Sequence, residues 1–197
     1  MKKALIIFVR NPELGKVKTR LAKSVGDEKA LEIYKDLLRH THEITLDVAC
    51  DKFIFYADAI NTTDIWENNL FNKELQSGIE LGQKMNNAFL KLFQKGYCKI
   101  VIIGSDCPSL TTGIIEEAFA KLDEADVIIG PSKDGGYYLL GLSDLITGLF
   151  ENKEWSTDKV FAGTLENIHS ENKKYALLPK LADIDTIEDY NDHYLSS

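Results

Sequence analysis

The chain has 197 residues, of which 44% are hydrophobic and 27% charged, and its 23 basic and 31 acidic side chains give a formal net charge of -8. This length is sufficient for a sizeable core, and we expect one domain over residues 1–197. The acidic balance argues against a general nucleic-acid or membrane-surface binder. No apolar run approaches the roughly 20 residues that a membrane span needs.

The cysteine content predicts a reducing, cytoplasmic compartment. The three cysteines are an odd number, and no two of them have C-x-x-C spacing. We therefore expect no disulfide framework. The apolar run that begins at Ala4 ends at Val9, because Arg10 interrupts it. A signal peptide needs about 7–15 apolar residues and then a small-residue cleavage site, so we expect no secretion signal.

Apolar runs alternate with helical patterns along the chain. Continuous apolar runs predict strands over residues 4–9, 53–57, 99–104, 127–129 and 137–140. Amphipathic patterns and N-cap residues predict helices over residues 27–49, 64–69, 81–92, 114–122, 143–150, 157–168 and 186–194. Buried strands separated by helices indicate an α/β fold, with a mostly parallel, mixed sheet between two layers of helices.

The first predicted strand leads into a basic loop, residues 10–20. Its basic side chains are those of Arg10, Lys16, Lys18 and Arg20, against the single acid Glu13. Ligands of open α/β sheets bind at the carboxyl ends of strands, so this loop suits a phosphate-rich ligand. It is neither a P-loop nor a dinucleotide-binding loop, because it lacks the glycines that those motifs need. A solvated basic turn is an equal alternative.

An acidic loop, residues 104–110, follows the third predicted strand. Asp106 therefore sits at a strand's carboxyl end, where a carboxylate can hold a Mg²⁺ that also binds ligand phosphates. The alternative is a turn-forming Asp before Pro108. Asp185 could supply a second carboxylate, but with Glu188 three residues later it also matches a helix N-cap and its capping-box partner. Spacing alone leaves both interpretations of Asp185 open.

Further candidates have strong structural alternatives. Residues 133–138 could bring backbone close to a ligand, with Asp134 accepting hydrogen bonds from hydroxyl groups, although Asp-Gly is also a hairpin signal. Residues 76–85 enter a helix and could pack on a base. Ser156 or Thr157 is the residue type of an ordinary helix N-cap.

Taken in order, five motifs resemble a known family. They are the basic loop, G-S-D-C-P-S-L, K-D-G-G-Y-Y-L-L-G, W-S-T and D-I-D-T-I-E-D-Y. The family is DUF2064, also called the radical-SAM/selenodomain-associated transferase family, and the resemblance runs from about residue 3 to residue 195. The DUF2064 family belongs to the nucleotide-diphospho-sugar transferase superfamily and is similar to the guanylyltransferases of cofactor F420 biosynthesis. The resemblance implies a three-layer α/β/α fold of the GT-A-like type.

The resemblance also implies a role for each matching position. The phosphates of a nucleotide would face Arg10, Gly15, Lys18 and Arg20. The base or ribose would lie near Gln76, Gly78 and Gly82. A divalent metal, Mg²⁺ or Mn²⁺, would bind to Asp106 and Asp185. An acceptor or sugar pocket would be lined by Asp134, Gly135 and Gly136, with Trp155 and Ser156 at its edge.

These roles predict a metal-dependent, glycosyltransferase-like enzyme with a nucleotide or nucleotide-sugar donor and an unidentified small-molecule acceptor. Its catalytic residues would be Lys18, Arg20 and Asp106. Lys18 and Arg20 would stabilise the charge that develops on the leaving phosphate, and Asp106 would hold the metal. The chain lacks the Gly-rich G-T-R loop of sugar nucleotidyltransferases, and in the acidic loop Ser105 precedes a lone Asp106 where typical glycosyltransferases carry D-x-D. Nucleotidyl transfer with release of pyrophosphate is therefore an alternative, as is a catalytically silent nucleotide-binding accessory protein.

Overall fold

The computed structural model describes residues 1–151, 153–155 and 157–194. Its strands are β1 (Lys3–Val9), β2 (Asp51–Tyr56), β3 (Phe71–Leu75), β4 (Lys99–Ile103), β5 (Val127–Pro131), β6 (Tyr137–Leu142) and β7 (Tyr175–Leu177). Its helices are α1 (Thr19–Val25), α2 (Asp27–Leu46), α3 (Leu81–Gln94), α4 (Thr112–Lys121), α5 (Val160–Ser170) and α6 (Ile187–Tyr194), with a 3₁₀ helix, η1 (Thr147–Phe150).

The strands form a seven-stranded sheet in the order β3-β2-β1-β4-β6-β5-β7. β1 pairs in parallel with β2 and β4, and β3 and β7 also pair in parallel with their neighbours. β6 runs antiparallel to β4 and to β5. The predicted mixed and mostly parallel sheet is therefore confirmed.

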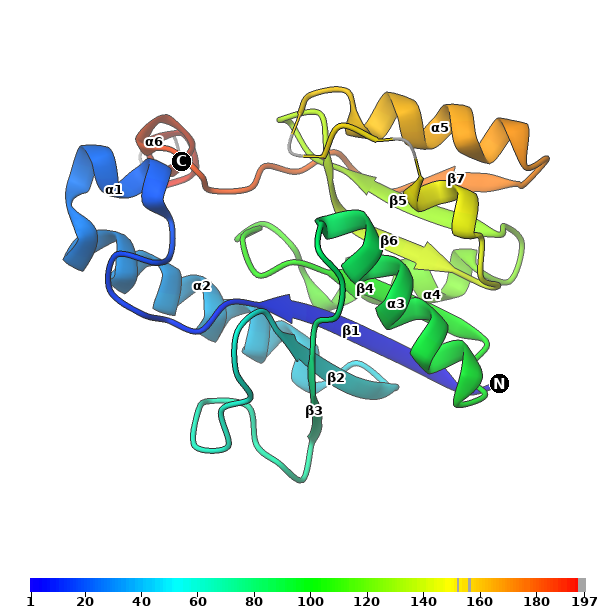
Figure 1. Ribbon diagram of the computed structural model, residues 1–197, viewed down its shortest axis with the longest axis horizontal. Helices are drawn as coiled ribbons and strands as arrows, with labels where there is room; N and C mark the ends of the chain where they lie inside the picture. Colours follow the sequence, from blue (N-terminus) through cyan, green and yellow to red (C-terminus); the bar gives the residue numbers. More distant parts are fainter. Residues whose placement is uncertain (152, 156, 195–197) are drawn as a thin grey trace.

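Helices cover both faces of this sheet (Figure 1). On one face Leu5 and Ile7 of β1 pack in a cluster with α2 and α4. On the other face Ala4 and Ile6 pack with α3, η1 and α5. Side chains alternate along a strand, so a strand buried on both faces has an unbroken apolar sequence, which is what residues 4–9 show. The predicted three-layer α/β/α arrangement is confirmed.

A separate small cluster positions the last helix. Leu21 of α1, Ile33 and Leu37 of α2 and Ile184 are buried together, and α6 packs at their side. Figure 1 shows α6 next to α1, beyond the carboxyl end of β1. The chain between β7 and α6 therefore passes over the carboxyl ends of the central strands. Within the described ranges, no helix is both long and apolar enough to cross a membrane.

Most predicted elements are confirmed to within a few residues, but the helix predicted over residues 64–69 is wrong. That segment forms turns and bends. The backbone N–H of Thr63 donates to Asn61 Oδ1 at 2.9 Å, and that of Trp66 donates to Asp64 Oδ1 at 3.1 Å. These side chains take the donors that a helix would use. Over residues 143–150 the structure has the short η1 in place of the predicted helix.

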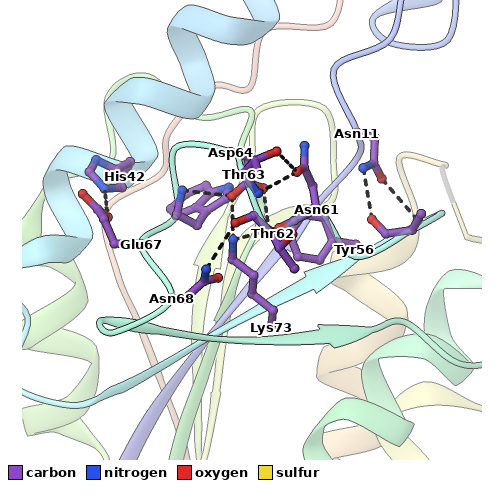
Figure 2. A network of polar contacts seen from close by, with 12 residues as sticks. Asn11, His42, Tyr56, Asn61, Thr62, Thr63, Asp64, Glu67, Asn68 and Lys73 are labelled. Carbon is purple, nitrogen blue, oxygen red and sulfur yellow. Dashed lines mark hydrogen bonds and ion pairs between the residues drawn. The ribbon is translucent and has the colours of Figure 1, made fainter.

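A buried polar network holds the 57–70 loop (residues 57–70), as Figure 2 shows. The Nζ of Lys73 donates to Asp64 Oδ1 at 2.8 Å and to the Asn61 carbonyl at 2.7 Å. The Tyr56 hydroxyl donates to the second Asp64 oxygen at 2.5 Å. The side chains of Lys73 and Asp64 are only 7% and 14% exposed, and each has its partners within the loop and the adjoining strands.

The 57–70 loop is joined to the basic loop through one side chain. Asn11 Nδ2 donates to the Ala59 carbonyl at 3.0 Å, and the Ala59 N–H lies 3.4 Å from Asn11 Oδ1 (Figure 2). The backbone N–H of Ala57 also donates to the Val9 carbonyl at 2.9 Å. The start of the basic loop is therefore supported by a part of the fold that is itself internally braced.

Candidate functional site

A cleft of about 580 Å³ opens at the carboxyl ends of β1 and β4. The chain leaves β1 toward β2 on one side, while β4 lies on the other side, so the cleft occupies the point where the strand order reverses. The basic loop, the acidic loop, the start of α3 and the segment before α6 surround it. The charged side chains that line it are Arg10, Lys16, Lys18, Arg20, Lys84, Asp106, Asp183 and Asp185.

The basic loop turns sharply before α1. Its first residue, Arg10, donates its backbone N–H to the Tyr34 hydroxyl of α2 at 2.9 Å. Gly15 has a φ of 73° and Lys18 a φ of 48°, both in the left-handed region that only glycine enters readily. Among the described residues the Arg10 guanidinium has no ion-pair partner, and it lines the cleft. The loop thus presents the Arg10 guanidinium to the cleft and directs Lys18 inward.

Lys18 lies at the base of the cleft between two acids. Its Nζ is 2.9 Å from Asp106 Oδ1 and 3.1 Å from Asp185 Oδ1, and its side chain is 4% exposed. Burial alone would lower the pKa of Lys18, but the charges of Asp106 and Asp185 outweigh it and raise the pKa above its usual value. The lysine therefore remains a cation at neutral pH. Arg20 approaches Asp185 from the exposed side, with Nη1 3.7 Å from Oδ2.

Asp106 has a carboxylate that the protein satisfies only in part. Its backbone carbonyl accepts the Ile184 N–H at 2.9 Å, which ties the acidic loop to the segment before α6. Oδ1 is buried, and it accepts no aligned hydrogen bond within the described part of the chain. The Lys18 ammonium is close to this oxygen, but as an ion pair rather than an aligned donor. The turn-forming interpretation of Asp106 gains no support, since no described backbone N–H donates to its carboxylate.

The cap of α6 settles the alternative interpretation of Asp185. Asp189 Oδ2 accepts the backbone N–H of Thr186 at 2.8 Å and that of Asp185 at 3.1 Å. In return, the Asp189 N–H donates to Thr186 Oγ1 at 3.3 Å, which completes a reciprocal cap one residue later than expected. The N-cap interpretation of Asp185 with Glu188 is therefore wrong. The Asp185 carboxylate is turned to Lys18 instead.

A third acid of the cleft, Asp183, is absent from the sequence-based candidates. Its Oδ2 accepts a hydrogen bond from Ser132 Oγ at 2.9 Å. Burial, together with the charge of Asp106, raises the pKa of the Asp183 carboxyl to about 7. Its spacing could have revealed it, because residues two apart in an extended segment point to the same side, and Asp185 is two residues further on.

The residues predicted to lie near a base or ribose are not all in the cleft. Gln76 lines it, and its Nε2 donates to the Phe55 carbonyl at 3.0 Å. Gly78 has a φ of 127°, which lets the chain turn into α3. Gly82 is covered by Trp155, because a Cβ on this glycine would come within 2.5 Å of the indole ring. Close packing between α3 and Trp155 thus explains the glycine at position 82.

Of the residues predicted for an acceptor or sugar pocket, Asp134, Gly135 and Gly136 lie on the β5–β6 loop, and Trp155 lies between η1 and α5. None of these four lines the cleft. Asp134 Oδ1 accepts the Gly136 N–H at 3.0 Å and so caps its own loop. Gly135 has a φ of 89°, and any Cβ there would overlap the Asp158 backbone. Local structure therefore accounts for Gly135 and for the acid. Ser156 lies outside the described residues.

The available oxygen ligands fit a divalent cation that shares its coordination with a bound ligand. In the described ranges, no group of three or more His, Cys, Asp or Glu side chains could hold a metal. Asp106 and Asp185 offer carboxylate oxygens, and Asp106 Oδ1 has no aligned hydrogen bond. Mg²⁺ usually takes one or two carboxylates and completes its shell with phosphates and water. The pair of acids suits Mg²⁺ or Mn²⁺ beside phosphates better than a closed site made of protein alone.

Known proteins resemble this chain in sequence and in architecture. Residues 40–157 match the family described as uncharacterized protein conserved in bacteria (DUF2064). All of the chain aligns, at 31% identity and a TM-score of 0.91, with 88% of a Desulfovibrio desulfuricans protein that is provisionally described as a nucleotide-diphospho-sugar transferase. No curated protein matches the sequence.

More distant structures share the fold alone. The manganese complex of Rv0371c from Mycobacterium tuberculosis is 14% identical, with a TM-score of 0.62 and full coverage of both chains. The 4-diphosphocytidyl-2C-methyl-D-erythritol synthase of Anaerococcus prevotii is 13% identical, with a TM-score of 0.63 and coverage of 100% of this chain and 96% of that one. The chain has the nucleotide-diphospho-sugar transferase fold, and it belongs to the DUF2064 family.

Proposed function

We propose that the chain is a metal-dependent transferase that uses a nucleotide or nucleotide-sugar donor. The observation that carries this proposal is the position of Lys18, which is buried between Asp106 and Asp185 at the base of a cleft whose rim is basic. Such an arrangement offers cations to phosphate oxygens and carboxylates to a divalent metal in one place.

The position of each charged side chain in the cleft suggests its role in the transfer. Arg10, Lys16 and Arg20 are exposed at the cleft and would bind the donor phosphates. Lys18, together with Arg20, would stabilise the charge that develops on the leaving phosphate. When bound at Asp106 and Asp185, Mg²⁺ or Mn²⁺ would neutralise part of the donor's phosphate charge. No covalent intermediate is required, because positioning and electrostatic stabilisation can suffice.

Two kinds of transfer fit this cleft. Glycosyl transfer is the first candidate, in keeping with the description of the Desulfovibrio desulfuricans protein. Nucleotidyl transfer is the second, and it is favoured by the fold shared with the Anaerococcus prevotii synthase. A volume of about 580 Å³ lies within the usual range for small-molecule sites. The two reactions leave different products, a nucleoside diphosphate in the first and pyrophosphate in the second.

The test is to identify the product formed from labelled donors. The protein would be incubated with nucleoside triphosphates or nucleotide-sugars, a deproteinised metabolite extract as the acceptor source, and Mg²⁺, Mn²⁺ or EDTA. We expect metal-dependent release of one product, and a loss of at least about 100-fold in Asp106→Asn. Asp47→Asn, an exposed change at the end of α2, is the matched control and should retain full activity.

A catalytically silent nucleotide-binding protein would give a different outcome. In that case nucleotides would raise the melting temperature without any metal-dependent product, and Asp106→Asn would leave their affinity nearly unchanged. Absence of both binding and turnover across the whole panel would contradict the transferase and the accessory protein alike.

A further inference from the structure

We propose that the Lys18 ammonium and a divalent cation compete for Asp106 and Asp185, so that the metal binds these acids only together with an anionic donor. When donor and metal bind, the Lys18 ammonium would pair with the donor phosphates, and the two carboxylates would be left to the metal. This inference rests on the proposed function, since it concerns the same phosphate and metal sites. It adds that the two carboxylates bind either the Lys18 ammonium or the metal, but not both at once.

The first argument is position. Lys18 Nζ lies 2.9 Å from one acid and 3.1 Å from the other, so it occupies the place that a cation shared by Asp106 and Asp185 would need. Arg20 adds a second positive charge 3.7 Å from Asp185. The two carboxylates are therefore already neutralised by two side-chain cations. A divalent cation entering alone would give the site a net positive charge, which an anionic donor would cancel.

The second argument is coordination. Within the described residues the chain offers no cluster of three or more metal-binding side chains, so most ligands of a bound ion must come from phosphate and water. Without the donor, a metal would have to displace Lys18 and would gain only two carboxylate ligands from the protein. With the donor, the same displacement gains phosphate oxygens for the metal and a phosphate partner for the lysine.

The third argument is that the lysine can be released. Nζ holds Asp106 Oδ1 at 2.9 Å as an ion pair and Asp185 Oδ1 at 3.1 Å as a hydrogen bond, so both contacts are made at the surface of the cleft and neither is covalent. The two acids are 42% and 43% exposed, which keeps them within reach of solvent and ions. The Lys18 backbone is held independently, because its carbonyl accepts the Ala22 N–H at 2.8 Å. Its four-carbon stem is flexible, so the ammonium could follow a phosphate that is bound beside Arg10 and Lys16.

The test measures Mn²⁺ binding without turnover. Mn²⁺ alone would be titrated by calorimetry into the wild type, Lys18→Met and the control Lys84→Met. Lys84 lines the same cleft and is not paired with Asp106 or Asp185, so its removal changes the charge of the cleft without releasing the two acids. We expect Lys18→Met to bind Mn²⁺ at least about tenfold more tightly than the wild type, and Lys84→Met to stay within about twofold. Adding Asp106→Asn to Lys18→Met should abolish the gain.

A second measurement uses the wild type and does not depend on any variant folding. Melting temperatures would be recorded with Mn²⁺ alone, with each of ATP, GTP, CTP and UTP alone, and with both together. Ligands that favour each other's binding stabilise the native state by more than the sum of their separate effects. We expect such synergy in the wild type with the preferred nucleotide, and its loss in Lys18→Met.

The outcomes separate this inference from the proposed function. If Mn²⁺ alone binds the wild type as tightly as Lys18→Met, and the added Asp106→Asn still abolishes binding to Lys18→Met, the competition is wrong while the metal site stands. Equal stabilisation of the wild type by Mn²⁺ with and without nucleotide would likewise overturn the competition. If Mn²⁺ binds no variant under any condition, the metal site itself is wrong, and the proposed metal-dependent transfer fails with it.

Discussion

Two buried lysines of this protein have similar partners and different surroundings. Lys73 donates to Asp64 and to the Asn61 carbonyl, and the second oxygen of Asp64 is taken by a tyrosine hydroxyl. Lys18 is equally buried, but it lies between two half-exposed acids, and one of their buried oxygens has no aligned hydrogen bond.

The difference distinguishes Lys73, a bracing lysine that holds a loop, from Lys18, which we propose is an exchangeable lysine that can leave its acids for a ligand. A closed network such as that around Lys73 has no atom to offer to a ligand, so its contribution goes into holding the 57–70 loop. The two acids around Lys18 are 42% and 43% exposed at a cleft, so charged ligands can reach them. Burial of a lysine alone would not have distinguished the two.

Removing the bracing lysine should have the largest effect on stability. Lys73→Met leaves Asp64 buried with one partner fewer, and we expect the free energy of unfolding to fall by about 3–5 kcal/mol. Urea unfolding measures it, with Lys29→Met as the control, because the Lys29–Glu32 pair is exposed and should matter by less than about 1 kcal/mol. Equal effects in the two variants would show that the network braces nothing.

The corresponding change at the exchangeable lysine should weaken ligand binding more than folding. In Lys18→Met the two acids can hydrate, so we expect the unfolding free energy to change by no more than about 1 kcal/mol. Affinity for the nucleoside triphosphate that gives the largest thermal shift should fall about tenfold, or about 1.4 kcal/mol, in calorimetry with Mg²⁺ present. A stability loss as large as that of Lys73→Met would contradict the distinction.

Asp183 tests the electrostatics beside the exchangeable lysine. Because its folded pKa is raised to about 7, the native state keeps a proton that the unfolded state releases, and this contribution to stability is lost as the pH rises through that value. Asp183→Asn has no proton to lose. We expect the wild type to lose up to about 4 kcal/mol relative to the variant between about pH 4 and about pH 8 in urea unfolding, since each pKa unit corresponds to about 1.4 kcal/mol. A pH-independent difference would show that Asp183 titrates normally.

The smallest expected effect is at the link between the two regions. Asn11→Ala removes the contacts with Ala59, and we expect a stability loss of about 0.5 kcal/mol and a fall of about twofold in nucleotide affinity. Asn68→Ala is the matched control, because its hydrogen bond to the Thr62 carbonyl lies within the 57–70 loop alone. If both variants bind nucleotide equally well, the braced loop does not support the cleft.

The sequence predicted the architecture well where burial dominates. Residues 4–9 and 100–103 are continuous apolar runs because β1 and β4 are covered on both faces. The edge strand β3 has a polar middle and is formed by its parallel pairing with β2, in which Lys73 is opposite Ile54. That pairing, and the burial of Lys73 by a distant acid, has no local signal.

For the site, the positions of Lys18 and Asp106 after two neighbouring strands were visible in the sequence. Whether Asp185 caps α6 or faces the cleft was not, since Thr186 and Asp189 form the same kind of cap one residue later. The glycines illustrate the opposite problem. A glycine that packs under an aromatic ring, as Gly82 does under Trp155, looks in sequence like one that admits a ligand.

The separation of Lys18 from Asp185 also has a consequence for folding. The two residues are 167 positions apart, so their contact requires a very long loop to close after the central strands have assembled. The small cluster of Leu21, Ile33, Leu37 and Ile184 must form as well before Asp185 is in place. We therefore expect the cleft to be among the last parts to fold and the first to open. Amide hydrogen exchange in α6 should slow when a donor binds, even if exchange in the central strands does not.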